Sequence, residues 1–308
     1  MTISLKPEAT RKIIRSLLIQ DESHRVAVFD EINRQFLEYA VEFFARVARA
    51  KLLGEELRAE DWYESELILQ AQDVNDVAIS AGIPMKTIEN IRRSTRREIV
   101  VETALDNYRS LHQTMEELLA VQQPEIILTI KLGSVGVDLS VSESLIVINS
   151  LAVKRDQIRG GMWSAVGNGV EKPLMRTLCL LFQVPDDHAR EAKHKEFKTQ
   201  IDYVLKAGSC DFLVEVKLSG KGNPETAKAA IAHKARLFVA DTIGETSRVL
   251  LEEEGVEWVE LGKPNGYLRL GQALKRLDIP HSDPRPLSEL DDILDEVLGK
   301  PGAEPPGD

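Results

Sequence analysis

Apolar residues recur every three or four positions through most of the first 120 residues, the spacing that gathers them on one face of a helix. This pattern predicts helices over residues 5–120 and is clearest in RKIIRSLLI, DEINRQFLEYAVEFFARVARAKLL and YRSLHQTMEELLAVQ. Pro124 interrupts it, and two shorter runs rich in β-branched residues follow, EIILTIKL and ESLIVINSLAV. Both runs are typical of strands.

The second half of the chain mixes the two periods. RGGMWSAVGNGVEKPLMRTLCLLFQV opens with glycines and becomes helical from about Val170 to Phe182. The next segments predict strand, strand, helix, strand, helix and strand in that order: KTQIDYVL, CDFLVEVKL, NPETAKAAIAHKA, RLFVADT, ETSRVLLEEEG and VEWVEL. This order predicts an α/β (α+β) fold in which helices flank a central mixed sheet.

These patterns divide the chain into three predicted regions: a helical region over 1–124, an α/β core over 125–265 and a C-terminal extension over 266–308. In the extension, LSELDDILDEVLGK predicts one helix. The final PGAEPPGD is acidic and rich in proline, which favours disorder.

Composition indicates a globular protein of 308 residues with 43% hydrophobic and 29% charged residues. No apolar run approaches the roughly 18 residues of a membrane span, so no membrane partner is expected. MTISLKPEAT lacks a signal-peptide pattern, and Cys179 and Cys210 lack metal-type spacing. We therefore expect a cytoplasmic location.

The net charge of −11 is unevenly distributed. Residues 165–240 hold 12 basic and 9 acidic side chains, whereas residues 241–308 hold 7 and 16. A polyanion could therefore approach the first of these stretches although the whole chain is acidic.

The predicted hairpin in that stretch carries three charges within its strands: Asp202, Glu215 and Lys217. Strand alternation places Glu215 and Lys217 on one face and apolar residues on the other. Pairing of residue 202 with either 213 or 215 brings Asp202 to the same charged face. Two interpretations stay open, a solvated ion pair or a site where two carboxylates bind a hard cation such as Mg²⁺.

The spacing D-x12-E-V-K on a hairpin, followed by helix, strand, helix and strand, resembles the PD-(D/E)xK nuclease superfamily. Ile201 stands where the nominal motif has proline. A longer stretch is similar to type II restriction endonucleases of the CfrBI type, over about residues 125–262: GGMWSAVGNGVEKPLM and QIDYVLKAGSCDFLVEVKLSGKGNPE.

The resemblance implies a restriction-endonuclease-like core and a role for each matching residue. Asp202 and Glu215 match the carboxylates that bind Mg²⁺, and the Val216 carbonyl matches a further ligand. Lys217 matches the catalytic lysine. Glu171 matches an acid that some members use to hold a water beside the metal, although an exposed charge favoured by the helix dipole explains it equally well.

A second candidate region is NDVAISAGIPMKTIENIRRSTRRE. Its small and aliphatic residues fall at helix-turn-helix spacing: Ala78, Gly82, Ile83, Ile88 and Ile91. The basic residues on and after the second helix are candidate DNA contacts: Lys86, Arg92, Arg93, Arg96 and Arg97. A plain helical hairpin with a solvated basic end is the alternative.

Three further candidates for DNA contact lie in loops beside the hairpin: Lys198, Lys221 and Asn223. Ordinary solvated loops would explain them too. The chain has no Walker lysine pattern and no G-x-G-x-x-G, and its histidines lack zinc-type spacing.

Taken with the resemblance, these features predict a Mg²⁺-dependent type II restriction endonuclease that hydrolyses double-stranded DNA at a short specific site. Region 1–124 would serve recognition or dimerisation, and symmetric sites imply a homodimer. The resemblance also implies a companion DNA methyltransferase. A repair or junction nuclease, and a helix-turn-helix regulator with an inactive core, are the alternatives.

Overall fold

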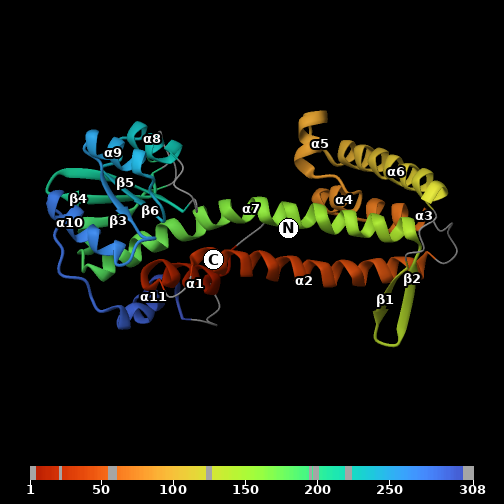
Figure 1. Cartoon of the computed structure of the whole chain (residues 1–308), viewed down its shortest axis with the longest axis horizontal. Helices are drawn as coiled ribbons and strands as arrows, with labels where there is room; N and C mark the ends of the chain where they lie inside the picture. The colour runs from red at the N-terminus through yellow and green to blue at the C-terminus, as the bar shows by residue number, and fades with distance from the viewer. Residues whose placement is uncertain are drawn as a thin grey trace. The chain divides into compact units, whose positions relative to one another are not determined.

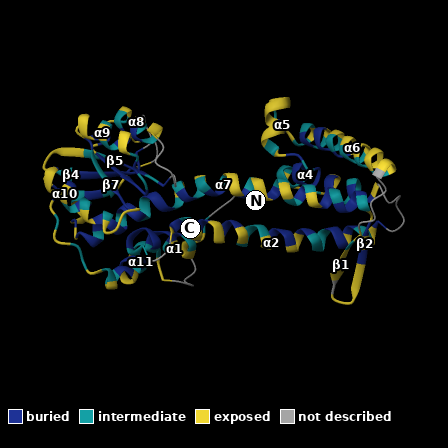
Figure 2. Cartoon of the chain, viewed as in Figure 1, coloured by how far each residue is buried: buried dark blue, intermediate teal, exposed yellow. Residues whose placement is uncertain are grey.

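The computed structural model describes residues 5–20, 23–54, 61–122, 127–193, 196, 201–218 and 224–300. The chain forms two compact units, here called the helical unit (Met1–Ile3 and Ile32–Gly161) and the sheet unit (Ser4–Glu31 and Met162–Asp308). Two long helices contribute residues to both units: α2 (His24–Leu53) and α7 (Val141–Leu181). Each unit has its own buried interior (Figure 2).

The helical unit adds shorter helices and one hairpin to its parts of α2 and α7. These are α3 (Asp61–Tyr63), a π-helix (Glu64–Leu69), α4 (Val74–Ser80), α5 (Met85–Arg92), α6 (Arg97–Gln122) and the antiparallel pair β1 (Leu128–Leu132) and β2 (Val135–Leu139). Its core is rich in aromatic residues, and the Tyr63 ring stacks on Tyr108 with ring centroids 5.4 Å apart.

Glu143 is buried in this unit and fully satisfied. Lys51 Nζ lies 2.6 Å from its Oε2, Trp62 Nε1 donates to its Oε1, and the Ser140 backbone N–H donates to its Oε2. Ser140 Oγ in turn accepts from the Glu143 N–H, which completes a capping box at the start of α7.

The sheet unit is built on a five-stranded mixed sheet of order β3-β4-β5-β6-β7. Its strands are β3 (Ala189–Glu191), β4 (Tyr203–Ala207), β5 (Cys210–Lys217), β6 (Leu237–Ala240) and β7 (Glu257–Glu260). The first three strands pair antiparallel, and β5, β6 and β7 pair in parallel. The parallel pairs require crossovers, which helices provide.

The crossover helices α8 (Pro224–Ala232) and α9 (Glu245–Glu253) lie on the same face of the sheet (Figure 1). Ala227, Ala230 and Leu251 pack there in one apolar cluster with Phe238 of β6. The unit also contains α1 (Pro7–Ile19), α10 (Arg269–Arg276) and α11 (Leu290–Leu298). All four residues of β6 are buried, as expected for an interior parallel strand.

The predicted α/β (α+β) class with a mixed sheet flanked by helices is confirmed. The strand predicted at ESLIVINSLAV is wrong, because this segment lies inside α7, which begins at Val141 and not near Val170. Its buried positions 143, 144, 146, 147 and 150 lie on one side of a helix, so packing overrides the β propensity of the local sequence.

The predictions missed β2, β3 and α10 but found the helix now seen as α11. The domain boundaries at 124 and 265 stay predictions, while α1, α10 and α11 all belong to the sheet unit. Residues 301–308, expected to be disordered, lie outside the described residues. In the described part of the chain, no helix combines the length and apolar character that crossing a membrane requires.

Candidate active site

The hairpin β4–β5 positions the charged residues singled out in the sequence. Its ladder runs from Ala207 opposite Cys210 to Tyr203 opposite Val214, which is the register that leads Asp202 toward Glu215 and not Leu213. Gly208 opens the two-residue turn with φ +57°, a conformation that glycine adopts without strain. Turn chemistry thus sets which residues meet at the far end of the hairpin.

Three carboxylates surround the Lys217 ammonium group at that end. Lys217 Nζ lies 3.5 Å from Glu171 Oε2, 3.6 Å from Asp202 Oδ2 and 3.9 Å from Glu215 Oε1. All three acids are buried, Glu215 to 1% exposure, and the lysine side chain is 21% exposed. The structure therefore brings together the four side chains predicted to do chemistry, and Glu171 is not the exposed helix charge that the alternative reading required.

Two of these carboxylates are held by backbone amides at the end of β5 and directly after it. Asp202 Oδ2 accepts from the Val216 N–H at 2.9 Å, and Glu171 Oε1 accepts from the Leu218 N–H at 3.4 Å. Both N–H groups point toward the side of β5 that pairs with β4. The pairing reaches only as far as Tyr203 opposite Val214, so no residue of β4 lies opposite these two amides. The Val216 carbonyl faces the same side, because the N–H and C=O of one strand residue point the same way.

Glu215 has a partner that sequence reasoning missed. His233, which follows α8, lies with Nδ1 2.9 Å from Glu215 Oε2. The helix ending in AHKA was predicted, but its histidine was weighed only as a zinc ligand. Its contact depends on how α8 returns the chain to β6, beside β5, and local sequence does not reveal that.

The crowding of acids shifts their proton affinities. Burial raises the pKa of Glu171 to about 7; Lys217 opposes this shift and Asp202 adds to it. Burial also raises the pKa of Glu215, against the opposing effects of Lys217 and His233. Burial lowers the pKa of Lys217, but the three carboxylates outweigh it, so that pKa is raised. One lysine leaves part of the negative charge uncompensated.

The chemistry of this donor set fits a hard divalent cation. Carboxylate and carbonyl oxygens are the ligands that Mg²⁺ prefers, and added positive charge would relieve the raised carboxylate pKa values. Among the described residues, no three His, Cys, Asp or Glu side chains stand as a preformed metal site. The acids are arranged around Lys217 instead.

The helix-turn-helix spacing corresponds to the pair α4–α5. Ala78 and Ile88 are fully buried, and Gly82 makes the turn with φ +71°. The expectation that Ile91 helps to seat the second helix is wrong, because its side chain is 63% exposed.

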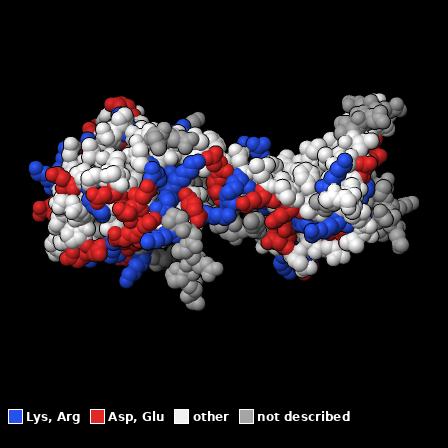
Figure 3. All heavy atoms as spheres, turned by 90° about the horizontal axis from the view of Figure 1, so that it is seen from below, with Lys and Arg blue, Asp and Glu red and all other residues white. Residues whose placement is uncertain are grey.

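Four of the basic residues proposed as DNA contacts here are exposed: Lys86, Arg92, Arg93 and Arg96. Arg92 lies 3.7 Å from Asp106 in an exposed ion pair. Such pairs are weak, so a phosphate of a polyanion could take the place of Asp106 beside Arg92. Arg97 donates to the carbonyls of Leu69 and Gln72, so it also closes a turn of the fold. The remaining candidates, Lys198, Lys221 and Asn223, lie outside the described residues. On the face seen in Figure 3, basic and acidic side chains are interspersed.

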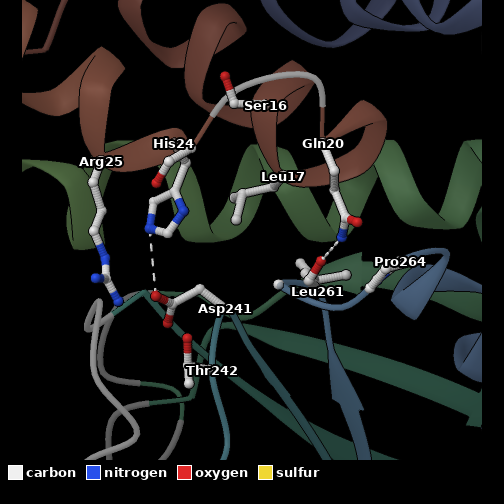
Figure 4. Close-up of a pocket in the computed structure, with 11 residues that line it drawn as sticks. Ser16, Leu17, Gln20, His24, Arg25, Asp241, Thr242, Leu261 and Pro264 are labelled. Carbon is white, nitrogen blue, oxygen red and sulfur yellow. Dashed lines mark hydrogen bonds and ion pairs between the residues drawn. The ribbon is translucent and has the colours of Figure 1, made fainter.

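A cavity of about 410 Å³ lies in the sheet unit where β6 and β7 end (Figure 4). His24 Nε2 lies 3.3 Å from the buried Asp241 Oδ2 on its wall, and Gln20 donates to the carbonyl of Leu261. A Cβ atom on Gly262 would stand 2.4 Å from the Asp241 carbonyl oxygen. The ends of β6 and β7 therefore pack against each other at Gly262, and the contacts of Gln20 and His24 link them to the end of α1 and the start of α2.

Comparison with known proteins gives one match. The model of a family described as CfrBI restriction endonuclease matches residues 7–248, well over half of the chain. No curated protein and no solved structure matches. The matched span contains the Lys217 cluster, His233 and the pair α4–α5.

Proposed function

The chain belongs to the CfrBI restriction endonuclease family, and from this premise we propose that it is a Mg²⁺-dependent type II enzyme. It would hydrolyse double-stranded DNA at a short specific site. The cluster around Lys217 would be its active site.

One observation carries this proposal: three buried carboxylates converge on a single lysine at the end of a strand. A fold that needed only an ion pair would require one acid for one base. Burying extra ionised acids costs free energy, and such clusters are concentrated at functional sites. The excess of oxygen donors therefore supports a site that takes up a cation.

Asp202, Glu215 and the Val216 carbonyl would hold Mg²⁺. When bound, the ion supplies positive charge to the phosphodiester and lowers the pKa of nearby water. Asp202 is already oriented by the Val216 N–H, which limits its rotation and reduces the entropy lost on binding.

Lys217 would donate to the attacking water or to a phosphate oxygen. Glu171, with a pKa of about 7, can accept a hydrogen bond or a proton from that water near neutral pH. The water oxygen forms a new bond to phosphorus, the bond to the leaving sugar oxygen breaks, and that oxygen takes up a proton.

The helical unit would contribute DNA binding through α5 and the turn after it. The exposed side chains of Lys86, Arg92, Arg93 and Arg96 suit phosphate contact, and Arg97 would orient the segment. Lys198, Lys221 and Asn223 are proposed to contact the DNA backbone near the site of cleavage.

A symmetric target requires two copies of the site, so we propose a homodimer, in solution or on DNA. Light scattering of the free protein and of its complex with a palindromic duplex tests this. A strict one-to-one complex would count against the homodimer. The family also suggests a companion DNA methyltransferase that protects the same target.

Plasmid incubated with the protein and Mg²⁺, and then resolved on a gel, tests the proposed activity. Discrete fragments support site-specific cleavage, a smear indicates a repair or other nonspecific nuclease, and intact DNA indicates a regulator with an inactive core. Glu215→Ala is the matched variant, and it should abolish cleavage while DNA binding in Ca²⁺ holds or improves. A well-folded Glu215→Ala protein that cuts at the parent rate would refute the site assignment.

A further inference from the structure

The Glu215 carboxylate has its two oxygens assigned to different partners. Oε2 lies 2.9 Å from His233 Nδ1, whereas Oε1 faces Lys217 Nζ at 3.9 Å. Since an ionised carboxylate can only accept, the imidazole donates from Nδ1. We propose that His233 is a positioning residue that makes Glu215 offer one oxygen, Oε1, to the divalent cation; this proposal rests on the proposed function.

The backbone holds His233 firmly in this place. Its N–H donates to the Ala229 carbonyl at 2.8 Å, and the Ala235 N–H closes back on the Ala230 carbonyl at 2.9 Å. Between them Lys234 takes a left-handed conformation with φ +60°, so the end of α8 is closed as a C-cap. The His233 side chain has only two torsions, and its contact with Glu215 therefore has little freedom to drift.

Among the described residues, His233 is the hydrogen-bond partner that directs Oε2 of Glu215. A glutamate has three side-chain torsions, and Glu215 is buried to 1% exposure, so its neighbours in the protein set how its carboxylate is turned. Without His233 the carboxylate could rotate and present both oxygens to one cation. With His233 it presents one.

This difference matters for the choice of ion. Mg²⁺ is small and demands a near-ideal octahedron, usually with single oxygens from carboxylates and several waters. Ca²⁺ is larger and readily takes both oxygens of one carboxylate. His233 should therefore favour Mg²⁺ over Ca²⁺ at this site.

Three variants of the full chain isolate the contact. His233→Ala removes the donor. His233→Asn keeps a donor, because the amide nitrogen of asparagine falls close to the place of Nδ1. His233→Gln carries its amide nitrogen further out, near the place of Nε2, and serves as the matched control. MgCl₂ and CaCl₂ are titrated separately into chelator-treated protein at one fixed pH, with heat of binding as the readout.

His233→Ala and His233→Gln should bind Mg²⁺ about tenfold more weakly, since partners that orient a ligand are typically worth ~10–100-fold in metal affinity. Ca²⁺ affinity should fall less, so the Mg²⁺-to-Ca²⁺ affinity ratio drops. His233→Asn should restore both the Mg²⁺ affinity and the ratio. Cleavage by His233→Ala should require more Mg²⁺ but approach the parent rate at saturation.

The proposal is overturned if His233→Ala binds Mg²⁺ as tightly as the parent. It is also overturned if the affinities for Mg²⁺ and Ca²⁺ fall by the same factor. If His233→Ala fails to fold, His233→Asn and His233→Gln are compared instead. Equal Mg²⁺-to-Ca²⁺ affinity ratios in these two variants would overturn the proposal. Glu215→Ala separates this outcome from failure of the proposed function. If that variant still binds metal and cuts, the site itself is misassigned; if it is inactive while His233→Ala matches the parent, only the role of His233 falls.

Discussion

Each unit of the molecule buries carboxylate against lysine, yet in different proportions. In the helical unit one acid, Glu143, meets Lys51 at 2.6 Å and has further donors for its oxygens. In the sheet unit three acids share Lys217 at 3.5 to 3.9 Å. A one-to-one pair that is satisfied at short range stabilises a fold. A three-to-one cluster at longer range remains short of positive charge, which is the condition for a cation site.

The largest expected effects come from replacing each of the two lysines, Lys217 and Lys51, in turn. Lys217→Met should lower the cleavage rate by about 10²- to 10³-fold or more, the usual cost of losing an aimed charge at a reacting group. Lys51→Met should instead destabilise the protein by about 3 kcal/mol, because Glu143 loses its buried partner. Cleavage rates and denaturant melts on both variants provide the measurement. If Lys51→Met lost activity per folded molecule and Lys217→Met kept it, the contrast would be reversed.

The raised pKa of Glu171 predicts a specific pH dependence of stability. Folding raises this pKa from 4.5 to about 7, so between these values the folded chain binds the proton more tightly than the unfolded chain. The contribution of Glu171 to stability is therefore lost as pH rises through this window. Relative to the parent, Glu171→Gln should match it near pH 4 and gain up to about 3 kcal/mol above pH 7.

Urea melts in the presence of a chelator, across this pH range, test the prediction. The exposed acid Glu98 in α6 supplies the control, and Glu98→Gln should show no such trend. A flat difference between Glu171→Gln and the parent at all pH values would mean that the cluster is not short of positive charge.

The smallest expected effect concerns the exposed basic residues of the helical unit. Arg92→Ala combined with Arg96→Ala should weaken binding to all DNA sequences alike and lower the salt slope of binding by roughly two units, one for each phosphate contact. Arg159→Ala, which removes another exposed arginine of the same unit, is the control. The measurement is the DNA affinity of the parent, the double variant and Arg159→Ala at several salt concentrations. An equal salt slope in all three proteins would mean that Arg92 and Arg96 are solvated surface residues without phosphate contacts.

Sequence alone predicted the mixed sheet and the meeting of Asp202, Glu215 and Lys217, because strand alternation is a local rule. Glu171 required the resemblance, since no local rule brings residue 171 to residue 217. His233 was missed because its contact depends on where the crossover helix ends. The β-branched run at 143–153 was misassigned as a strand because burial along a long helix outweighs local propensity.

The backbone amides that hold Asp202 and Glu171 have a consequence for solubility. Among the described residues, no strand pairs with β5 beyond Val214 on that side, and unpaired strand edges invite pairing with other chains and aggregation. Asp202 occupies the Val216 N–H and Glu171 the Leu218 N–H, so these acids cover the open edge as a neighbouring strand would. An alanine at either position would remove a reactive group and also leave a backbone N–H at this strand edge without its acceptor.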